Sequence, residues 1–246
     1  MNQLYLYGRN PLKEALKCGQ KGILGRVFLT PQAEADGALL GALQRHGIKH
    51  ERVTQEEVES MVGRDAIHQG VCATVNERDL YMNLDEALKK ASTDRERPLL
   101  VLLDELQDPH NVGAIIRSAA AFGASAIILP EHDQAQITST VIKTSAGAVF
   151  SIPIVRITNV NTTLRTLKDK GYWTYALTGD GDTKLNSTTF DTPVVIVVGN
   201  EGEGIKPKTL EVCDFKLSIP IDGHVESLNA SNAAAVTFYE WSKQAD

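Results

Sequence analysis

The stretch PLLVLLDELQDPHNVGAIIRSAAAFGASAIILP, residues 98–130, contains two apolar runs on either side of a helical pattern. The runs PLLVLLDEL (98–106) and ASAIILP (124–130) have the length and the Leu, Ile and Val content of buried strands. The segment NVGAIIRSAAAFG (111–123) between them is typical of a helix that covers a sheet. Two strands joined by a crossover helix run parallel, so this stretch predicts one strand–helix–strand unit of a parallel sheet.

The same alternation continues to the end of the chain. We expect, in order, a helix at 137–148, a strand at 152–157, a helix at 161–171, strands at 173–179 and 193–199, and a closing helix after Leu228. Continuous apolar strands joined by helices are buried on both faces. The sequence therefore predicts the α/β class, with a parallel sheet covered by helices on both sides.

The first part of the chain has the pattern of a smaller α/β unit. Asn10 is a candidate N-cap, with Pro11 at the first helical position. Further helices are predicted at 35–47 and 54–63, and strands at 26–30 and 70–75. Residues 76–98 are polar and charged, with a weak helix at 84–91. We predict an N-terminal domain at 1–76, a linker at 77–97 and a second domain at 98–246.

Composition limits the class of protein. With 42% hydrophobic and 23% charged residues among 246, the chain is typical of a water-soluble globular protein. No apolar run approaches the ~20 residues of a membrane span, so no membrane partner is expected. The three cysteines contain no CxxC pair, which argues against a metal site or a disulfide framework and favours the cytoplasm. The net charge of −6 falls entirely after residue 97 and disfavours a nucleic-acid partner.

The first candidate site is DELQDPHNVGAIIRSAAAFG, residues 104–123, at the end of a predicted strand. Open α/β folds bind ligands at the carboxyl ends of their strands. Asn111 is a candidate cap for the helix that follows, and Gly113 permits close backbone approach. Arg117 lies on a strongly apolar helix, where a cation is expected to need a partner.

The second candidate site is PVVIVVGNEGEGI, residues 193–205, in which three glycines surround two carboxylates after an apolar strand. The spacing fits neither a P-loop nor the dinucleotide-binding fingerprint. Glu201 and Glu203 would also repel phosphate. A ligand that carries positive charge fits this loop better.

The third candidate site is IPIDGHVESLNASNAAAVTFYEW, residues 219–241. A helix start uses one polar cap, and this segment offers five polar side chains, Glu226, Ser227, Asn229, Ser231 and Asn232. Ser227 or Asn229 can cap the helix. The surplus polar groups indicate a binding site.

Taken together, the three segments resemble the motifs of the SpoU (TrmH/RlmB-type) RNA 2′-O-ribose methyltransferases. NVGAIIRSA (111–119) is similar to Asn-x-Gly-x-x-x-Arg-x-Ala, GNEGEG (199–204) to Gly-Asn-Glu-Gly-x-Gly, and IPIDGHVESLNAS (219–231) to Ile-Pro-Met-x-Gly-x-x-x-Ser-Leu-Asn-Val-Ser. YGRNPLKEAL (7–16) and HQGVCATV (68–75) resemble the substrate-binding domain of the RlmB-like subgroup.

This resemblance implies a SPOUT-type catalytic domain with a C-terminal trefoil knot, preceded by a small α/β domain that binds RNA. It implies a homodimer with S-adenosylmethionine as cofactor, contacted by Gly199, Ile219 and Leu228. The family's catalytic positions fall on Asn111, Arg117, Glu201, Ser227 and Asn229. On this reading Arg117 binds an RNA phosphate, Asn111, Ser227 and Asn229 orient it and the hydroxyl, and Glu201 holds Arg117 or the loop.

The expected reaction is methylation of a ribose 2′-hydroxyl, with a guanosine of 23S-type ribosomal RNA favoured over tRNA. Two further alternatives remain open from the sequence. One is a non-catalytic RNA-binding or ribosome-assembly protein with the same fold. The other is a small-molecule or nucleotide-binding α/β enzyme, which would suit the net negative charge. The motifs favour the methyltransferase because none of their functional side chains is missing.

Overall fold

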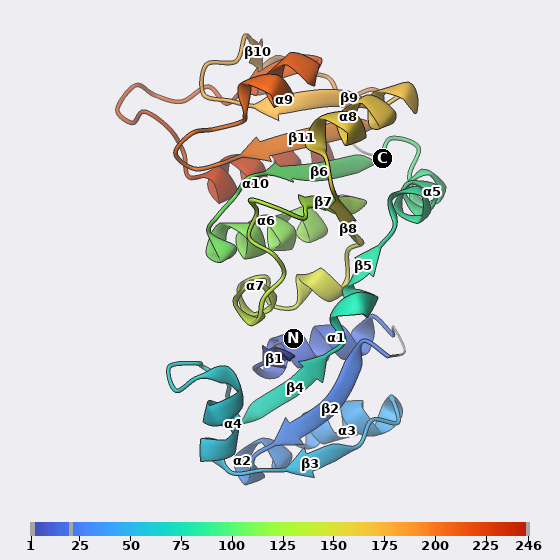
Figure 1. The fold of residues 1–246 in the computed structure, drawn as a ribbon, viewed down its shortest axis with the longest axis vertical. Helices are drawn as coiled ribbons and strands as arrows, with labels where there is room; N and C mark the ends of the chain where they lie inside the picture. The colour runs from blue at the N-terminus through green and yellow to red at the C-terminus, as the bar shows by residue number, and fades with distance from the viewer. Residues whose placement is uncertain (1–2, 20–21, 245–246) are drawn as a thin grey trace. The chain divides into compact units, whose positions relative to one another are not determined.

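A computed structural model describes residues 3–19 and 22–244. The chain divides into two compact units, which are described separately (Figure 1). Unit 1 comprises residues 1–81 and 137–151, and unit 2 comprises residues 82–136 and 152–246.

Unit 1 is built on a four-stranded sheet in the order β1-β4-β2-β3. β4 is antiparallel to β1 and β2, whereas β3 pairs parallel with β2 and forms an edge. This arrangement has the small α/β architecture predicted for the first part of the chain. Its elements are β1 (Leu4–Tyr7), α1 (Arg9–Lys17), β2 (Leu24–Leu29), α2 (Pro31–Glu34), α3 (Gly37–Arg45), β3 (His50–Arg52), α4 (Gln55–Val62), β4 (Val71–Val75), η1 (Glu77–Leu80), α7 (Ser139–Thr144) and η2 (Ala148–Phe150).

One predicted helix start in unit 1 is wrong. Asn10 is not a cap, because α1 begins at Arg9, two residues earlier than predicted, and its N-cap is Gly8, at a φ of 92° that favours glycine. The helix predicted at 35–47 is preceded by a separate short helix, α2. Thr30 caps α2 and Asp36 caps α3, each through its side-chain oxygen, so α3 lies within the predicted range and α2 is an additional helix that was not predicted.

Unit 2 is built on a sheet in the order β10-β12-β9-β11-β6-β7-β8-β5, parallel from β10 to β8. The sheet and its helices are β5 (Tyr81–Met82), α5 (Leu84–Asp94), β6 (Leu99–Asp104), α6 (Pro109–Ala121), β7 (Ala126–Pro130), β8 (Ile154–Ile157), α8 (Val160–Asp169), β9 (Trp173–Leu177), β10 (Thr183–Lys184), η3 (Leu185–Ser187), β11 (Val194–Gly199), α9 (Pro207–Val212), β12 (Phe215–Ser218) and α10 (Ala230–Ser242).

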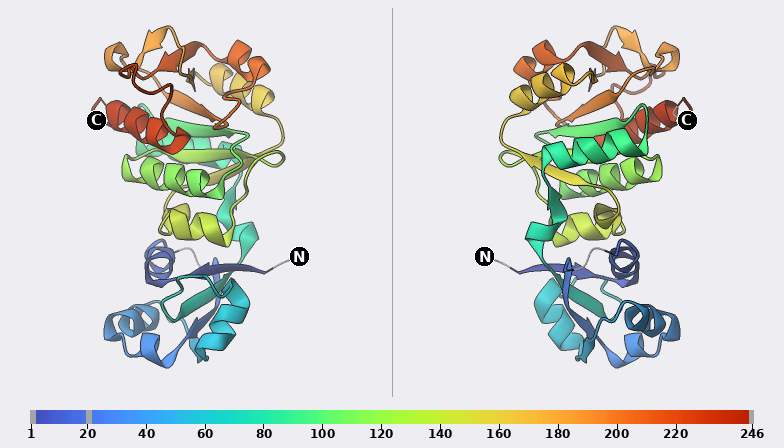
Figure 2. Two further views of the ribbon diagram at one scale, coloured as in Figure 1. Left: turned by 90° about the vertical axis from the view of Figure 1, so that its left-hand side faces the viewer. Right: turned by 90° about the vertical axis from the view of Figure 1, so that its right-hand side faces the viewer.

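The two central strands, β6 and β11, are buried along their whole length. They pair in register from Val194–Leu99 to Gly199–Asp104. Side chains of α5, α8 and α9 pack with one face of the sheet, and α6 and α10 lie together on the other (Figure 2). The predicted parallel α/β fold, covered on both faces, is confirmed.

The order of connections reverses between β6 and β11. From β6 the chain continues through β7 to β8, whereas β11 and β9 lie on the other side of β6. In open α/β sheets such a switch point opens a crevice at the carboxyl ends of the strands, and ligands bind there. The fold therefore places the first two candidate sites, which follow β6 and β11, at one edge of the sheet.

The segment predicted as a linker, residues 77–97, contains η1, β5 and α5. The weak helix predicted at 84–91 is α5, and its Ala87, Leu88 and Ala91 are buried in the core of unit 2. The predicted domain boundaries at 76 and 97 remain predictions. Over the residues that the structure describes, no helix combines the length and the apolar character that crossing a membrane requires.

Candidate active site

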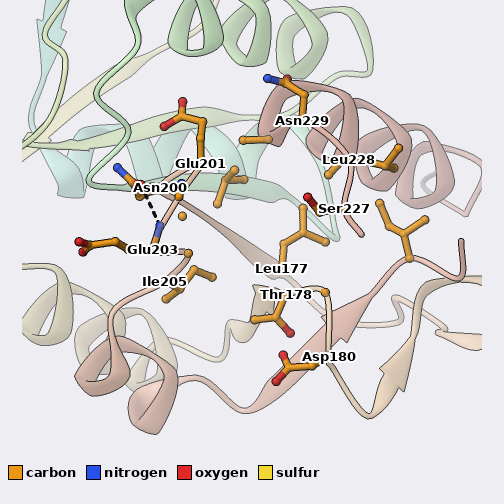
Figure 3. A pocket seen from close by; sticks show the side chains of 18 of the residues that line it. Leu177, Thr178, Asp180, Asn200, Glu201, Glu203, Ile205, Ser227, Leu228 and Asn229 are labelled. Atoms are coloured by element: carbon orange, nitrogen blue, oxygen red, sulfur yellow. Dashed lines mark hydrogen bonds between the residues drawn. The ribbon is translucent and has the colours of Figure 1, made fainter. Parts of the chain in front are cut away.

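A cavity of about 570 Å³ opens at the carboxyl ends of β9 and β11 (Figure 3). Its walls come from three segments that are far apart in the sequence: the end of β9 with the turn after it, the glycine-rich loop after β11, and the loop that leads into α10. The volume falls within the roughly 300–1,000 Å³ typical of small-molecule sites. The predicted cofactor contacts Gly199, Ile219 and Leu228 all line this cavity, as do Glu201, Ser227 and Asn229.

The glycine-rich loop, residues 199–205, is folded around Asn200. Asn200 and Gly204 exchange two backbone hydrogen bonds of 3.0 Å, which close the loop into a tight turn. The Asn200 side-chain oxygen accepts from the backbone N–H groups of Gly202 (2.8 Å) and Glu203 (3.1 Å). Its amide nitrogen donates to the carbonyl of Glu105 at 2.9 Å, which ties the loop to the end of β6. Sequence analysis did not single out Asn200, although asparagine is a common turn residue for this reason.

Gly199 ends β11 where the loop folds back over it. A Cβ atom at this position would lie 2.5 Å from the carbonyl carbon of Gly204 and 2.5 Å from the backbone nitrogen of Ile205. Only a glycine lets the returning chain pass this closely. Gly199 therefore lets the loop fold closely over the end of β11 beside the cavity.

Asn111 and Glu201 are brought together from the first and second candidate sites. The Asn111 amide donates to Glu201 Oε1 at 2.7 Å, across 90 residues of sequence. Asn111 is 8% exposed, and it is not the cap of α6 as predicted. Asp108 is the N-cap and Pro109 the first helical residue, so α6 begins earlier and Asn111 lies in its first turn. The side chain is thereby free to hold the acidic loop.

A second set of contacts joins the end of the same loop to the end of β6. Asp104, 2% exposed, accepts from the backbone nitrogen of Lys206 at 3.3 Å, and Glu105 forms an ion pair with the Lys206 ammonium. Burial raises the pKa of the Asp104 carboxyl. Glu105 has a φ of 62°, which is uncommon for a residue other than glycine. The pair Asp104–Glu105 at the end of an apolar strand was the available sequence signal for this support.

The C-terminal loop carries Ser227 and Asn229. Asn229 is the N-cap of α10, and its side-chain oxygen accepts from the backbone nitrogen of Ser231 at 2.9 Å and from the Ser231 hydroxyl at 2.6 Å. The predicted cap is thus confirmed for Asn229. Ser227 is exposed on the cavity wall, and Leu228 between them is 37% exposed. One polar residue serves the helix, which leaves Ser227 available to a ligand.

Arg117 lies apart from this group. It is exposed on α6 and does not line the cavity, and in the described part of the chain it forms no ion pair or hydrogen bond. The expectation that it needs a partner is wrong because the helix presents it to solvent rather than to the sheet, where charge costs little. The alternative that Glu201 holds Arg117 is not realised, since Glu201 accepts from Asn111.

The charge of the cavity favours a cationic ligand. Among the described residues that line it, every ionisable side chain is a carboxylate: Asp180, Glu201, Glu203 and Glu226. Apolar contacts come from Leu177, Ile205, Ile219 and Leu228. The hydroxyl of Thr178 is buried in the wall without a hydrogen-bond partner in the described chain, so a polar ligand group can reach it. A molecule with an apolar ring system, hydroxyl groups and a positive charge fits this set of groups.

Fold and site together define a two-unit α/β protein with an acidic, glycine-walled ligand cavity at the switch point of a parallel sheet. Two family models cover most of the chain: the SpoU rRNA methylase family matches residues 98–239, and an RNA 2′-O ribose methyltransferase substrate-binding domain matches residues 5–81. The chain therefore belongs to the SpoU family of RNA methyltransferases, as its motifs predicted.

Curated relatives agree with this assignment. The chain is 39% identical over 240 residues to an uncharacterized tRNA/rRNA methyltransferase of Mycobacterium sp. (strain KMS), covering 96% of this chain and 75% of the relative. It is 36% identical over 243 residues to another from Synechocystis, covering 97% of this chain. The chain spans 62% of the length of that Synechocystis protein.

Solved structures with the same fold include two that hold AdoMet (S-adenosylmethionine). The SpoU methyltransferase AviRb of Streptomyces viridochromogenes, in complex with this cofactor, has a TM-score of 0.80 and 26% identity over 99% of this chain and 90% of its own. An AdoMet-bound rRNA methyltransferase of Sinorhizobium meliloti has a TM-score of 0.80 and 25% identity over 98% and 87%. The A. aeolicus TrmH/SpoU tRNA modifying enzyme matches only 65% of this chain and 82% of its own, with a TM-score of 0.54 and 26% identity.

Proposed function

We propose that this protein transfers a methyl group from S-adenosylmethionine to a ribose 2′-hydroxyl of RNA. The observation that carries the proposal is the cavity, in which all four ionisable groups among the described lining residues are carboxylates, beside the tight glycine-rich turn at Gly199. A sulfonium cofactor suits this charge, whereas a phosphate-bearing cofactor does not. Unit 1, which matches the substrate-binding family over residues 5–81, supplies the RNA-binding function.

Cofactor binding falls to Gly199, Ile219 and Leu228, together with the acidic groups of the cavity. The sulfonium supplies an already activated methyl group, so the chemical task left to the protein is to align the hydroxyl and to manage its proton. Thr178, whose hydroxyl has no partner in the described chain, is an available donor toward a polar group of the cofactor. No step requires a metal ligand from this chain.

Ser227 is the polar side chain best placed to orient the ribose. It lies on the same cavity wall as Leu228 and has no structural task at the helix start, which Asn229 fulfils. Asn111 holds Glu201, and with it the acidic loop, in position. In this proposal Asn111 and Glu201 act on the reaction by fixing the loop, and Asn229 by fixing the start of α10.

Arg117 binds an RNA phosphate in our proposal and stabilises negative charge that develops on the 2′-oxygen. A guanidinium is effectively never deprotonated in proteins, so a role as general base is not assigned to it. Its exposure and its lack of an internal partner leave all of its donors available to RNA. Arg117→Lys tests this role, because lysine keeps the charge but loses the bidentate fork. We expect kcat to fall at least tenfold with unchanged cofactor affinity; near-normal turnover would exclude the proposal.

Ribosomal RNA is favoured over tRNA as the substrate. The similarity to the Sinorhizobium rRNA methyltransferase extends over both units, whereas the similarity to the tRNA-modifying enzyme stops at 65% of this chain. The part of this chain that matches the rRNA methyltransferase but not the tRNA-modifying enzyme is the part that we expect to select the RNA. We propose a guanosine of 23S-type ribosomal RNA as the methylated nucleotide, and the cytoplasm as the location of the protein, as the sequence predicted.

A homodimer is part of this proposal. Two large apolar side chains of α10, Val236 and Tyr239, are 43% and 54% exposed, and Phe122, directly after α6, contacts Tyr239 with 5.7 Å between ring centroids. Apolar groups gathered on one pair of helices are typical of a covered surface. Sedimentation of the full chain at micromolar concentration distinguishes the dimer from the monomer. The C-terminal knot implied by the family likewise remains a prediction.

The decisive experiment offers the protein methyl-labelled S-adenosylmethionine with protein-free 23S RNA, 16S RNA and tRNA in parallel. We expect label in 23S RNA alone, at one nucleotide that becomes resistant to alkaline hydrolysis, since 2′-O-methylation removes the hydroxyl that attacks the neighbouring phosphate. Label in a base, or in tRNA alone, would overturn the corresponding part of the proposal. Tight RNA binding without any transfer would favour a non-catalytic RNA-binding protein.

A further inference from the structure

RNA binding by a chain of net charge −6 requires a local surface where positive charge predominates. The cofactor cavity cannot provide it, because its ionisable groups are all carboxylates. The segment RHGIKHER, residues 45–52, differs from the rest of the chain: it holds three Lys or Arg residues and two histidines against one carboxylate. This segment runs from the end of α3 through β3, the edge strand of the unit 1 sheet.

The sheet register places a further arginine beside this segment. β3 pairs with β2 so that Val27 faces His50 and Leu29 faces Arg52, and Arg26 directly precedes Val27. Alternate residues of a strand point to opposite faces, so Arg52 and His50 share one face while Glu51 lies on the other. The edge therefore presents basic groups on both faces of the sheet. We define the basic edge as Arg26, Arg45, His46, Lys49, His50 and Arg52.

The carboxylates near the basic edge neutralise only part of it. Glu34 contacts both His50 (3.0 Å) and Arg52 (3.1 Å), and Glu51 lies 3.8 Å from Arg26. The Arg26 and Arg52 side chains are nevertheless 71% and 67% exposed. Arg45 and Lys49 are exposed as well, and within residues 3–19 and 22–244 they form no ion pair. Two full positive charges are thus without a counter-charge on this edge.

Several other acidic residues of unit 1 serve the fold. Glu56 and Glu57 lie in the first turn of α4, where they favour the helix dipole, and Glu57 closes a capping box with Thr54. Glu59 accepts from Gln55 at 2.9 Å. These carboxylates are engaged in helix capping and local hydrogen bonds, so Arg45 and Lys49 remain the basic-edge residues available to a polyanion.

We propose that the basic edge of unit 1 is the surface on which the RNA phosphate backbone lies, with Arg45 and Lys49 as its two principal phosphate contacts. The inference rests on the proposed function, since it names the surface that would bring RNA to the methyltransferase unit. The partner is RNA rather than an acidic protein because the RNA 2′-O ribose methyltransferase substrate-binding family covers this unit. Charged side chains can also guard an edge strand against pairing with another strand. If these side chains only prevented strand pairing, RNA affinity would not depend on Arg45 and Lys49.

The test compares the full chain with a variant that carries Arg45→Gln and Lys49→Gln. Affinity for protein-free bacterial 23S RNA is measured at several KCl concentrations between 50 and 200 mM, and the slope of log K against log salt is taken. Each lost phosphate contact reduces the magnitude of this negative slope by about 0.7–0.9. The slope of the double variant should therefore be smaller in magnitude by about 1.4–1.8. If the affinity extrapolated to 1 M salt is unchanged, this corresponds to roughly 25- to 60-fold weaker binding at 100 mM.

A matched control carries Lys89→Gln and Lys90→Gln on α5, which removes the same charge from exposed positions in unit 2. We expect it to keep the wild-type slope. Equal losses in both variants would mean that only net charge matters and would overturn the inference, as would an unchanged slope in the Arg45/Lys49 variant. S-adenosylmethionine affinity and thermal unfolding, measured on each protein, confirm that the fold and the cofactor site are intact.

The outcome for the proposed function is separate. If the wild type methylates RNA but the basic-edge variant binds RNA equally well, only this inference fails. If the wild type binds no RNA at 50 mM salt, the proposed function and this inference fail together.

Discussion

Replacing Gly199 by alanine is expected to disable the cofactor site while the protein stays folded. The added Cβ would lie 2.5 Å from the Gly204 carbonyl carbon, 2.5 Å from the Ile205 nitrogen and 2.6 Å from Ile205 Cγ1. Ordinary contact begins at about 3.4 Å, so the backbone at 204–205 must move by about 0.9 Å. Two of the three neighbours are main-chain atoms, which cannot avoid the clash by a rotamer change.

The size of the effect follows from that displacement. Overpacking of this kind costs about 1–3 kcal/mol of stability, which a chain of this size tolerates. A misplacement of about 1 Å in a binding site can cost about 100-fold in activity. We therefore expect the Kd for S-adenosylmethionine to rise about 100-fold in Gly199→Ala, and kcat/KM for methyl transfer to fall by a similar factor.

Calorimetric titration of S-adenosylmethionine into the wild type, Gly199→Ala and Gly202→Ala measures this directly. Gly202 lies in the same loop, and the nearest atom to its added Cβ would be Asn200 Oδ1 at 3.5 Å, an ordinary contact. Gly202→Ala is thus the matched control and should bind within about twofold of the wild type. A folded Gly199→Ala protein with a Kd within threefold of the wild type would refute the argument that backbone crowding shapes this wall. Equal losses in both variants would refute it as well.

Two further predictions concern contacts of unit 2. Asn111→Ala removes the hydrogen bond to the Glu201 carboxylate. Hydrogen bonds to charged groups contribute about 1.5–3 kcal/mol, and the exposure of Glu201 favours the lower value. We therefore expect kcat/KM to fall about tenfold. A double-mutant cycle with Glu201→Gln should give a coupling near 1 kcal/mol or more, and simple additivity would contradict the contact. Burial alone would raise the pKa of Asp214, but the ion pair with Lys168 (2.7 Å) and hydrogen bonds from Thr174 lower it overall. A depressed folded-state pKa stabilises the protein above the unfolded-state pKa, and this stability is lost as pH falls through the folded-state value. In urea unfolding, Asp214→Asn should therefore lose less stability on acidification than the wild type; parallel curves would argue against it.

The fold of unit 2 could be predicted because its strands are buried on both faces. β6 and β11 read as continuous apolar runs, and the helices between the strands are amphipathic, so element type and order follow from the sequence alone. Helix starts were predicted less well. At α6 the pair Asp108–Pro109 is a stronger start than Asn111, and at α1 a glycine with positive φ replaces a side-chain cap.

Six of the predicted site residues line the cavity, but the contacts among the predicted residues did not follow from the sequence. Sequence patterns indicated Asn111 and Glu201 separately, since each follows an apolar strand. Their hydrogen bond depends on β6 and β11 being neighbours in the sheet, although β7, β8, β9 and β10 intervene in the chain. Strand adjacency of this kind is a property of topology that local pattern does not encode. The exposure of Arg117 was missed for a similar reason, because the apolar pattern of α6 does not say which of its faces α10 covers.

Net charge misled the sequence argument because it averages over groups with different tasks. Glu201, Glu203 and Glu226 line the cavity that we propose for the cofactor, where negative charge suits a sulfonium and repels RNA phosphates. A basic residue there would draw the RNA backbone into the space that the cofactor needs. In our proposal RNA binds at the basic edge of unit 1, in a different compact unit, so that both ligands can bind without competing for the same charges. A total of −6 is then compatible with an RNA substrate, provided that the positive groups are gathered on one surface.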